Sequence, residues 1–145
     1  MLGYIITYNK KVGMLHISFA ALNLNKTETV KLSDGSDFTR YCFITLPEEW
    51  KFFSLPTVQS YTMFSYFALF DNKFSEKVMP NNISCGSYHI SELQKIVFKA
   101  KNLIDLKYKN AFLKKESIFL IIEKFEQFII VARNAGADTI SWNLV

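Results

Sequence analysis

Cysteine and glycine are both scarce in this 145-residue chain, and each shortage excludes a kind of site. The two cysteines, Cys42 and Cys85, are too few for a disulfide framework, and with His16 and His89 they lack the paired short spacings of a zinc site. Five glycines leave little scope for a phosphate-binding loop, and no Walker or dinucleotide-binding pattern occurs. We therefore expect no metal and no cofactor, and the free thiols favour a cytoplasmic location.

Charge and long apolar runs are limited as well. Charged residues make up 21% of the chain and hydrophobic residues 50%, a balance that excludes disorder driven by low hydrophobicity. The formal charge of +4 is a mild excess that favours an acidic partner. The uncharged stretch from Phe52 to Phe70 could be mistaken for a membrane span, but Pro56, Gln59 and its hydroxyl side chains disfavour insertion. We expect no membrane partner.

Aromatic residues are what the chain has in abundance. It contains 14 Phe, 7 Tyr and 2 Trp, which indicates an aromatic core, an aromatic binding face, or both. The length of 145 residues is typical of one domain and allows a core that needs neither disulfide nor metal. We predict a single globular domain over residues 1–145.

The first half of the sequence alternates with the period of β-strands, so we predict a largely antiparallel sheet of five or six strands there. A turn at residues 33–37 separates two of these strands, and the Pro47–Trp50 segment predicts a short helical turn. The predicted strands are 3–8, 15–19, 27–32, 38–46, 60–70 and 74–79, the first two forming a hairpin.

The second half changes to helical spacing, so the fold class predicted is α+β with two helices packing on the sheet. Ser91 and Gln94 fit a capping box at the start of the first helix, and Glu116–Ala135 predicts a second helix ended by Gly136. The alternative for the last part is a hairpin of 128–133 and 139–145. In both interpretations a short strand ends the chain. Five residues form the apolar stripe of the first helix: Leu93, Ile96, Val97, Ala100 and Ile104.

The nearest approach to a catalytic motif is the pair Cys85 and His89, which lie four residues apart just before the first predicted helix. A helix N-terminus can lower a thiol pKa and an imidazole can take its proton, but this spacing carries no family signature and favours a structural loop cysteine. An exposed helix face or a first helical turn explains each carboxylate considered as an acid or base, namely Glu48, Glu49, Glu116, Glu123 and Glu126. We predict that the protein is not an enzyme.

Binding to another macromolecule is the remaining class of function, and a protein partner is our first hypothesis. Trp50, Phe52 and Phe53 cluster beside two prolines, where an irregular segment could present an exposed aromatic patch. The hypothesis is a small inhibitor that occludes one protein partner. An immunity protein that binds a toxin domain, or a phage or host antagonist, would act in this way.

The alternative hypothesis is binding of single-stranded nucleic acid. Tyr61 and Tyr66 could stack on unpaired bases, and lysines of the first predicted helix and its continuation could contact phosphates. The lysines concerned are Lys95, Lys99, Lys101, Lys107 and Lys109.

Overall fold

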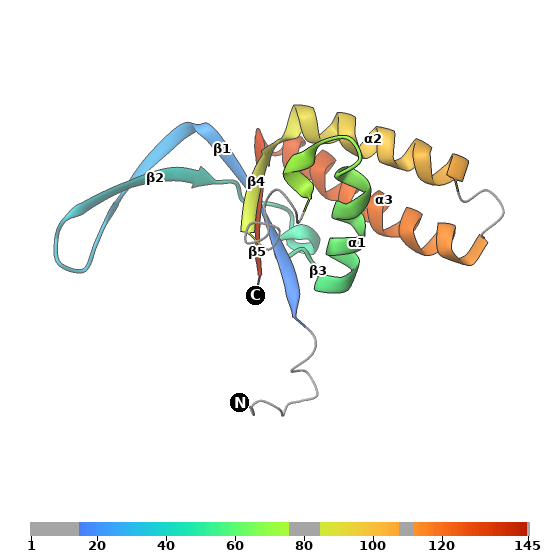
Figure 1. Cartoon of the computed structure of the whole chain (residues 1–145). Helices are drawn as coiled ribbons and strands as arrows, with labels where there is room; N and C mark the ends of the chain where they lie inside the picture. Colours follow the sequence, from blue (N-terminus) through green and yellow to red (C-terminus); the bar gives the residue numbers. More distant parts are fainter. Residues whose placement is uncertain (1–14, 76–84, 108–111, 145) are drawn as a thin grey trace, which may run out of the picture.

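The computed structural model describes residues 15–75, 85–107 and 112–144, apart from the side chains of 105–107 and 112–116. It has two layers, an antiparallel sheet of order β2-β1-β5-β4 and three helices that lie against one face of it (Figure 1). A short strand, β3, also pairs with β1. The strands are β1 (His16–Lys31), β2 (Asp37–Phe43), β3 (Ser54–Pro56), β4 (Cys85–His89) and β5 (Thr139–Leu144). The helices are α1 (Thr57–Phe67), α2 (Ile90–Lys107) and α3 (Phe112–Asn134), with single 3-10 turns η2 (Glu48–Trp50) and η3 (Asn72–Phe74).

Strand β1 belongs to two different parts of the structure. Its first half, from Ile17 to Leu22, lies inside the sheet and pairs with β5, while β3 pairs with its beginning. The register with β2 shifts between Asn23 and Thr27, where the ladder is interrupted by a bulge. Beyond this point β1 and β2 leave the sheet as a two-stranded hairpin, residues 24–41, which we call the arm (Figure 1).

The core fills the space between the sheet and the helices with aromatic rings. Alternate residues of β1 and β5, among them Phe19 and Trp142, point inward and are buried. The phenyl ring of Phe19 lies 5.1 Å from that of Phe125 on α3 and 6.4 Å from that of Phe64 on α1. Each fully buried ring of this size contributes on the order of 2 kcal/mol through the hydrophobic effect.

The predicted α+β class is confirmed, and the second half is close to its prediction. Helix α2 begins at Ile90, one residue before the predicted cap Ser91, and all five residues of its predicted apolar stripe are buried. Helix α3 ends at Asn134 and is followed by Gly136, whose φ of +104° favours glycine. The alternative hairpin interpretation of 128–133 is therefore wrong, whereas the C-terminal strand is confirmed as β5.

Several predictions for the first half are wrong. The segment 60–70 is not a strand, because α1 covers 57–67 and buries Ser60, Met63, Phe64 and Phe67 at helical spacing. Residues 27–31 form a strand as predicted, but they continue β1 and do not make a separate strand. Of the predicted strand 74–79, Phe74 belongs to η3.

The predicted strand 3–8 and most of 74–79 lie outside the described residues. Residues 15–19 were the expected hairpin partner of 3–8. At Ile17 this strand has β3 on one edge and β5 on the other. Strand β4 was missed, because its sequence Cys85–His89 contains Gly and Ser and was interpreted as a loop.

Residue 86 of β4 has to be glycine because it lies in close contact with the Trp142 side chain. A Cβ atom at residue 86 would lie 3.0 Å from Cζ2 of the Trp142 indole, which is itself stacked on Phe74 and cannot retreat freely. We predict that Gly86→Ala lowers the free energy of unfolding by about 1–3 kcal/mol. Urea denaturation should show a lower midpoint with an unchanged slope.

The matched control is Ser87→Ala, the next residue of β4, whose side chain is exposed. It should change stability by less than about 0.5 kcal/mol. Equal stability of the two variants would mean that the Gly86 contact with the indole does not constrain the core.

Candidate functional site

The helices cover one face of the sheet, and the opposite face, which we call the outer face, has an unusual composition. Apart from Leu22, its side chains are small or polar, and none of those on residues 16–22 of β1, on β5 and on β4 is Asp, Glu, Lys or Arg, although 21% of the chain is charged. Because side chains alternate along a strand, these residues point away from the buried set. They are His16, Ser18, Ala20, Leu22, Thr139, Ser141, Asn143, Cys85, Ser87 and His89. Of these, Thr139 is buried, with 1% of its surface exposed.

A shallow hollow of about 390 Å³ lies in the middle of the outer face. Ser18 and Ala20 of β1 and Ser141 of β5 form part of its lining, and their short side chains leave the space open. Phe43, at the end of β2, stands at the edge of the hollow with 61% of its surface exposed. An uncharged hollow beside an exposed aromatic ring is typical of the central part of a protein interface.

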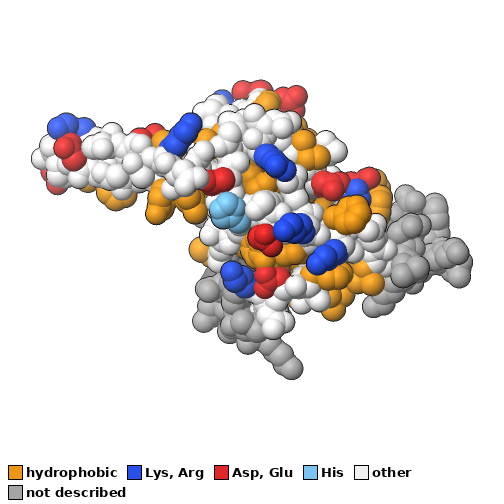
Figure 2. Space-filling view, turned by 90° about the horizontal axis from the view of Figure 1, so that it is seen from above, with side chains coloured by type: hydrophobic (Ala, Val, Ile, Leu, Met, Phe, Trp, Pro, Cys, Tyr) orange, Lys and Arg blue, Asp and Glu red, His pale blue; other side chains and the backbone are white. Residues whose placement is uncertain are grey.

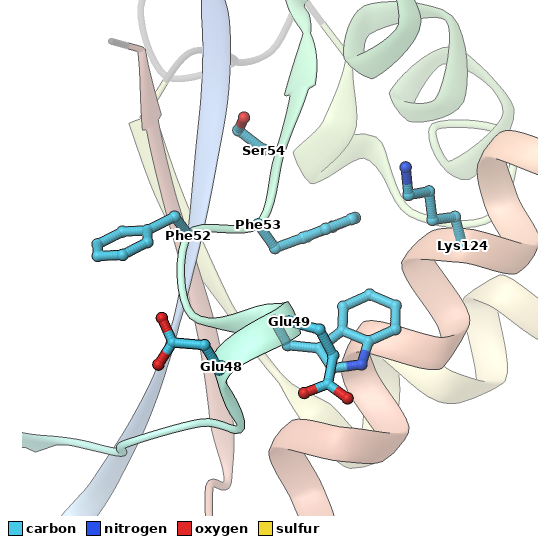
Figure 3. Close-up of a pocket in the computed structure, with 7 residues that line it drawn as sticks. Glu48, Glu49, Phe52, Phe53, Ser54 and Lys124 are labelled. Atoms are coloured by element: carbon cyan, nitrogen blue, oxygen red, sulfur yellow. The ribbon is translucent and has the colours of Figure 1, made fainter.

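The three aromatic residues of the predicted binding patch, Trp50, Phe52 and Phe53, do not all point to the same side of the sheet. Phe53 points toward the helices and stacks on Phe128 at 4.7 Å, and Trp50 is half-buried with its ring 5.5 Å from that of Phe53. Phe52 points to the other side of β1, away from the helices, and 85% of its surface is exposed (Figure 3). Only Phe52 of the three is fully available to a partner, and it lies on the same side of the sheet as the outer face.

A second hollow, of about 400 Å³, lies beside Phe52 (Figure 3). We call it the rim pocket. Next to it, the Ser54 hydroxyl lies 3.2 Å from Nδ1 of His16, a contact that joins β3 to the outer face. The residues that line the pocket are Glu48, Glu49, Trp50, Phe52, Phe53, Ser54 and Lys124.

The arm exposes more aromatic surface. Phe38 and Tyr41 are about half exposed, and within the described residues no second layer covers either of them. Ion pairs between Glu28 and Arg40 at 2.7 Å and between Lys31 and Asp37 at 3.1 Å join the two strands. Figure 2 shows the arm projecting from the body with charged groups of both signs at its tip.

The two strands of the arm and the turn between them were predicted, but their departure from the sheet and the exposure of Phe43 were not, although a signal was present. Residues 37–43 place aromatic side chains on both faces of a strand that also carries Asp, Thr and Arg. A strand with polar residues on both faces is not half-buried in a sheet, and the clear turn at Asp34 and Gly35 marks the tip of a hairpin.

The pair Cys85 and His89 does not form a reactive site. Both residues lie on β4, where four residues of extended chain separate their Cα atoms by about 13 Å. Both side chains are exposed on the outer face. Among the residues that the structure describes, no cluster of His, Cys, Asp and Glu has the composition of a metal site.

The residues of the nucleic-acid hypothesis are dispersed. Lys95 and Lys99 are exposed on α2, but Lys101 is mostly buried and its ammonium lies 2.8 Å from the Glu126 carboxylate. Tyr61 is half-buried and Tyr66 is buried, both on α1 rather than on a strand. The side chain of Lys107 and all of Lys109 lie outside the described part of the chain.

A partly buried polar contact fixes the edge of the sheet beside the outer face. The Tyr88 hydroxyl donates a hydrogen bond to the Asp71 carboxylate, and the backbone amide of Lys73 donates a second. Burial by itself raises the pKa of Asp71, but these two hydrogen bonds and the Lys73 charge more than offset it, so the pKa lies below its ordinary value. Burial and the bond to Asp71 raise the pKa of Tyr88, which keeps the hydroxyl protonated as a donor.

Comparison with known proteins gives no relative: no family model, no curated protein and no solved structure matches the chain. In the described part of the chain, no helix has the length and apolar character needed to cross a membrane.

The Asp71 contact predicts a pH-dependent contribution to stability. Because the pKa of Asp71 is lowered in the folded state, its contribution is present above the ordinary value of 3.8 and is lost as the pH falls through the folded value. We predict that Asp71→Asn is less stable than the unmodified protein by on the order of 1 kcal/mol at pH 7, and that the difference shrinks by pH 3. Thermal unfolding at the two pH values measures both quantities.

Asp37→Asn is the matched control. It removes a carboxylate whose ion pair with Lys31 is exposed, so its effect at pH 7 should be small. A stability difference for Asp71→Asn that stays constant from pH 7 to pH 3 would contradict a role for the Asp71 charge.

Proposed function

We propose that this chain is a non-enzymatic protein-binding protein, a small inhibitor that covers a site on one protein partner through its outer face. The observation that carries the proposal is the absence of ionised side chains from the described outer face together with the exposure of Phe43 and Phe52 beside it. Charged residues are depleted at the centres of protein interfaces, and aromatic residues are enriched there. In a chain with 17 basic and 13 acidic residues, an uncharged face of this kind favours contact with another protein.

The same surface favours a protein over a nucleic acid. Contacts to phosphates depend on Lys and Arg, and the described side chains of the outer face include neither. The arm adds Phe38 and Tyr41 as further contacts that could grip a partner beyond the sheet. Such a surface binds and occludes without turnover, as an immunity protein does with a toxin domain or a phage or host antagonist with its target. The two free cysteines suit a partner in the cytoplasm.

The experiment compares three forms of the tagged protein as bait in lysate of the native host: the unmodified chain, Phe43→Ser/Phe52→Ser and Phe98→Ser. Phe98 is the control because it is 62% exposed but lies on α2, away from the outer face. We expect one stoichiometric protein with the unmodified chain and with Phe98→Ser, and at least a tenfold loss with the double variant, as for interface hot spots. All three forms should show the same thermal unfolding, because exposed rings contribute little to the core.

The purified partner then supplies the test of inhibition. Its activity should fall to baseline at a one-to-one ratio with the unmodified chain, and the double variant should need at least tenfold more protein. Retention of the partner by Phe43→Ser/Phe52→Ser would contradict the proposal. So would recovery only of nucleic acid that is released as salt rises.

A further inference from the structure

The rim pocket carries a charge of opposite sign to that of the whole chain. Its lining has two carboxylates, Glu48 and Glu49, and one ammonium, Lys124, whereas the chain has a formal charge of +4. Glu48 lies 3.6 Å from the ammonium of Lys51, but with 85% of the Glu48 side chain exposed this pair contributes little. Glu49 and Lys124 have no ion pair among the described residues. The pocket therefore keeps acidic groups available to a ligand.

The charges are separated across an aromatic surface. In Figure 3 the two carboxylates lie on one side of Phe53 and the ammonium of Lys124 lies on the opposite side. Trp50 also lines the pocket, with its ring 5.5 Å from that of Phe53. Phe52 stands at the outer edge and exposes most of its ring. A cationic group that enters beside the carboxylates also meets aromatic faces, and both interactions favour a cation.

We propose that the rim pocket binds an arginine side chain. A planar guanidinium can stack on the ring of Phe52 or Trp50 while its N–H groups donate to the carboxylates of Glu48 and Glu49, a combination that a compact ammonium does not achieve. The volume of about 400 Å³ is at the lower end of the range for small-ligand sites and accommodates one side chain. That the arginine belongs to the inhibited partner rests on the proposed function; the affinity for guanidinium does not.

The test uses the two tryptophans of the chain as probe and internal reference. Trp50 lines the rim pocket, and Trp142 is buried in the core with 6% of its surface exposed. Each indole N–H gives its own signal in a ¹⁵N-edited NMR spectrum of the full chain, and Trp50→Phe assigns them. Titration with Nα-acetyl-arginine amide should shift the Trp50 signal saturably, with half-saturation at millimolar concentration, and leave the Trp142 signal in place.

The matched ligand control is Nα-acetyl-citrulline amide, which has nearly the same shape without the charge, at equal ionic strength. It should leave the Trp50 signal in place. Glu48→Gln/Glu49→Gln should raise the dissociation constant for the arginine amide at least fivefold, while Glu92→Gln, an exposed acid on α2, should leave it unchanged. Equal shifts with citrulline, no shift with arginine, or unchanged affinity in the double variant would each overturn the proposal.

The two proposals fail separately. Arginine binding without any protein partner would support the pocket and overturn the inhibitor. A partner that depends on Phe43 and Phe52 but binds Glu48→Gln/Glu49→Gln with unchanged affinity would support the inhibitor. It would also show that the rim pocket does not bind an arginine of that partner.

Discussion

The inward position of Phe19 on β1 is the constraint on which the rest of the structure depends. Its ring lies within 6.4 Å of five other aromatic rings that come from the segment before β3, from α1, from α3 and from β5. It therefore joins both layers of the fold in one contact set, and the sheet cannot shift against the helices without separating these rings. The rings are those of Phe53, Phe64, Phe125, Phe128 and Trp142.

The same constraint determines what the outer face presents. Side chains alternate along β1, so burial of Phe19 places Ser18 and Ala20 on the opposite side, and a slip of one residue would exchange the two sets. The core needs large apolar residues at the inward positions but sets no such requirement at the outward ones. Small uncharged residues outside are thus a separate property of the sequence, which is why they can be interpreted in terms of function.

How far the sequence predicted the structure depends on how much of the information was local. The apolar stripe of α2, the end of α3 at Gly136 and the last strand follow from periods and caps within a short window, and they were predicted. Helix α1 was not, because its Thr, Ser, Tyr and Phe residues resemble a strand and only contact with the core makes them helical. Of the predicted binding patch, Phe52 is exposed, but no local signal separates it from the buried Phe53 beside it. The exposure of Phe43 and the formation of the hollow depend on which strands pair in the sheet. Local sequence patterns do not determine this pairing.

The direction of the arm is fixed at its base, where β1 and β2 leave the sheet. An isolated two-stranded ribbon is only marginally stable in water, yet the base of this one is held by the loop between α3 and β5. One carboxylate oxygen of Asp138 accepts from the backbone amide of Leu24 at 3.0 Å and the other from the Asn25 side chain at 2.9 Å. The side-chain amide of Asn23 donates to the Gly136 carbonyl at 2.8 Å. These bonds fix the base of the arm against the end of the sheet. The left-handed turn at Gly136 therefore helps to fix the base of the arm as well as ending the helix. Under the proposed function, an arm that is held in place before binding would lose less conformational entropy when a partner docks.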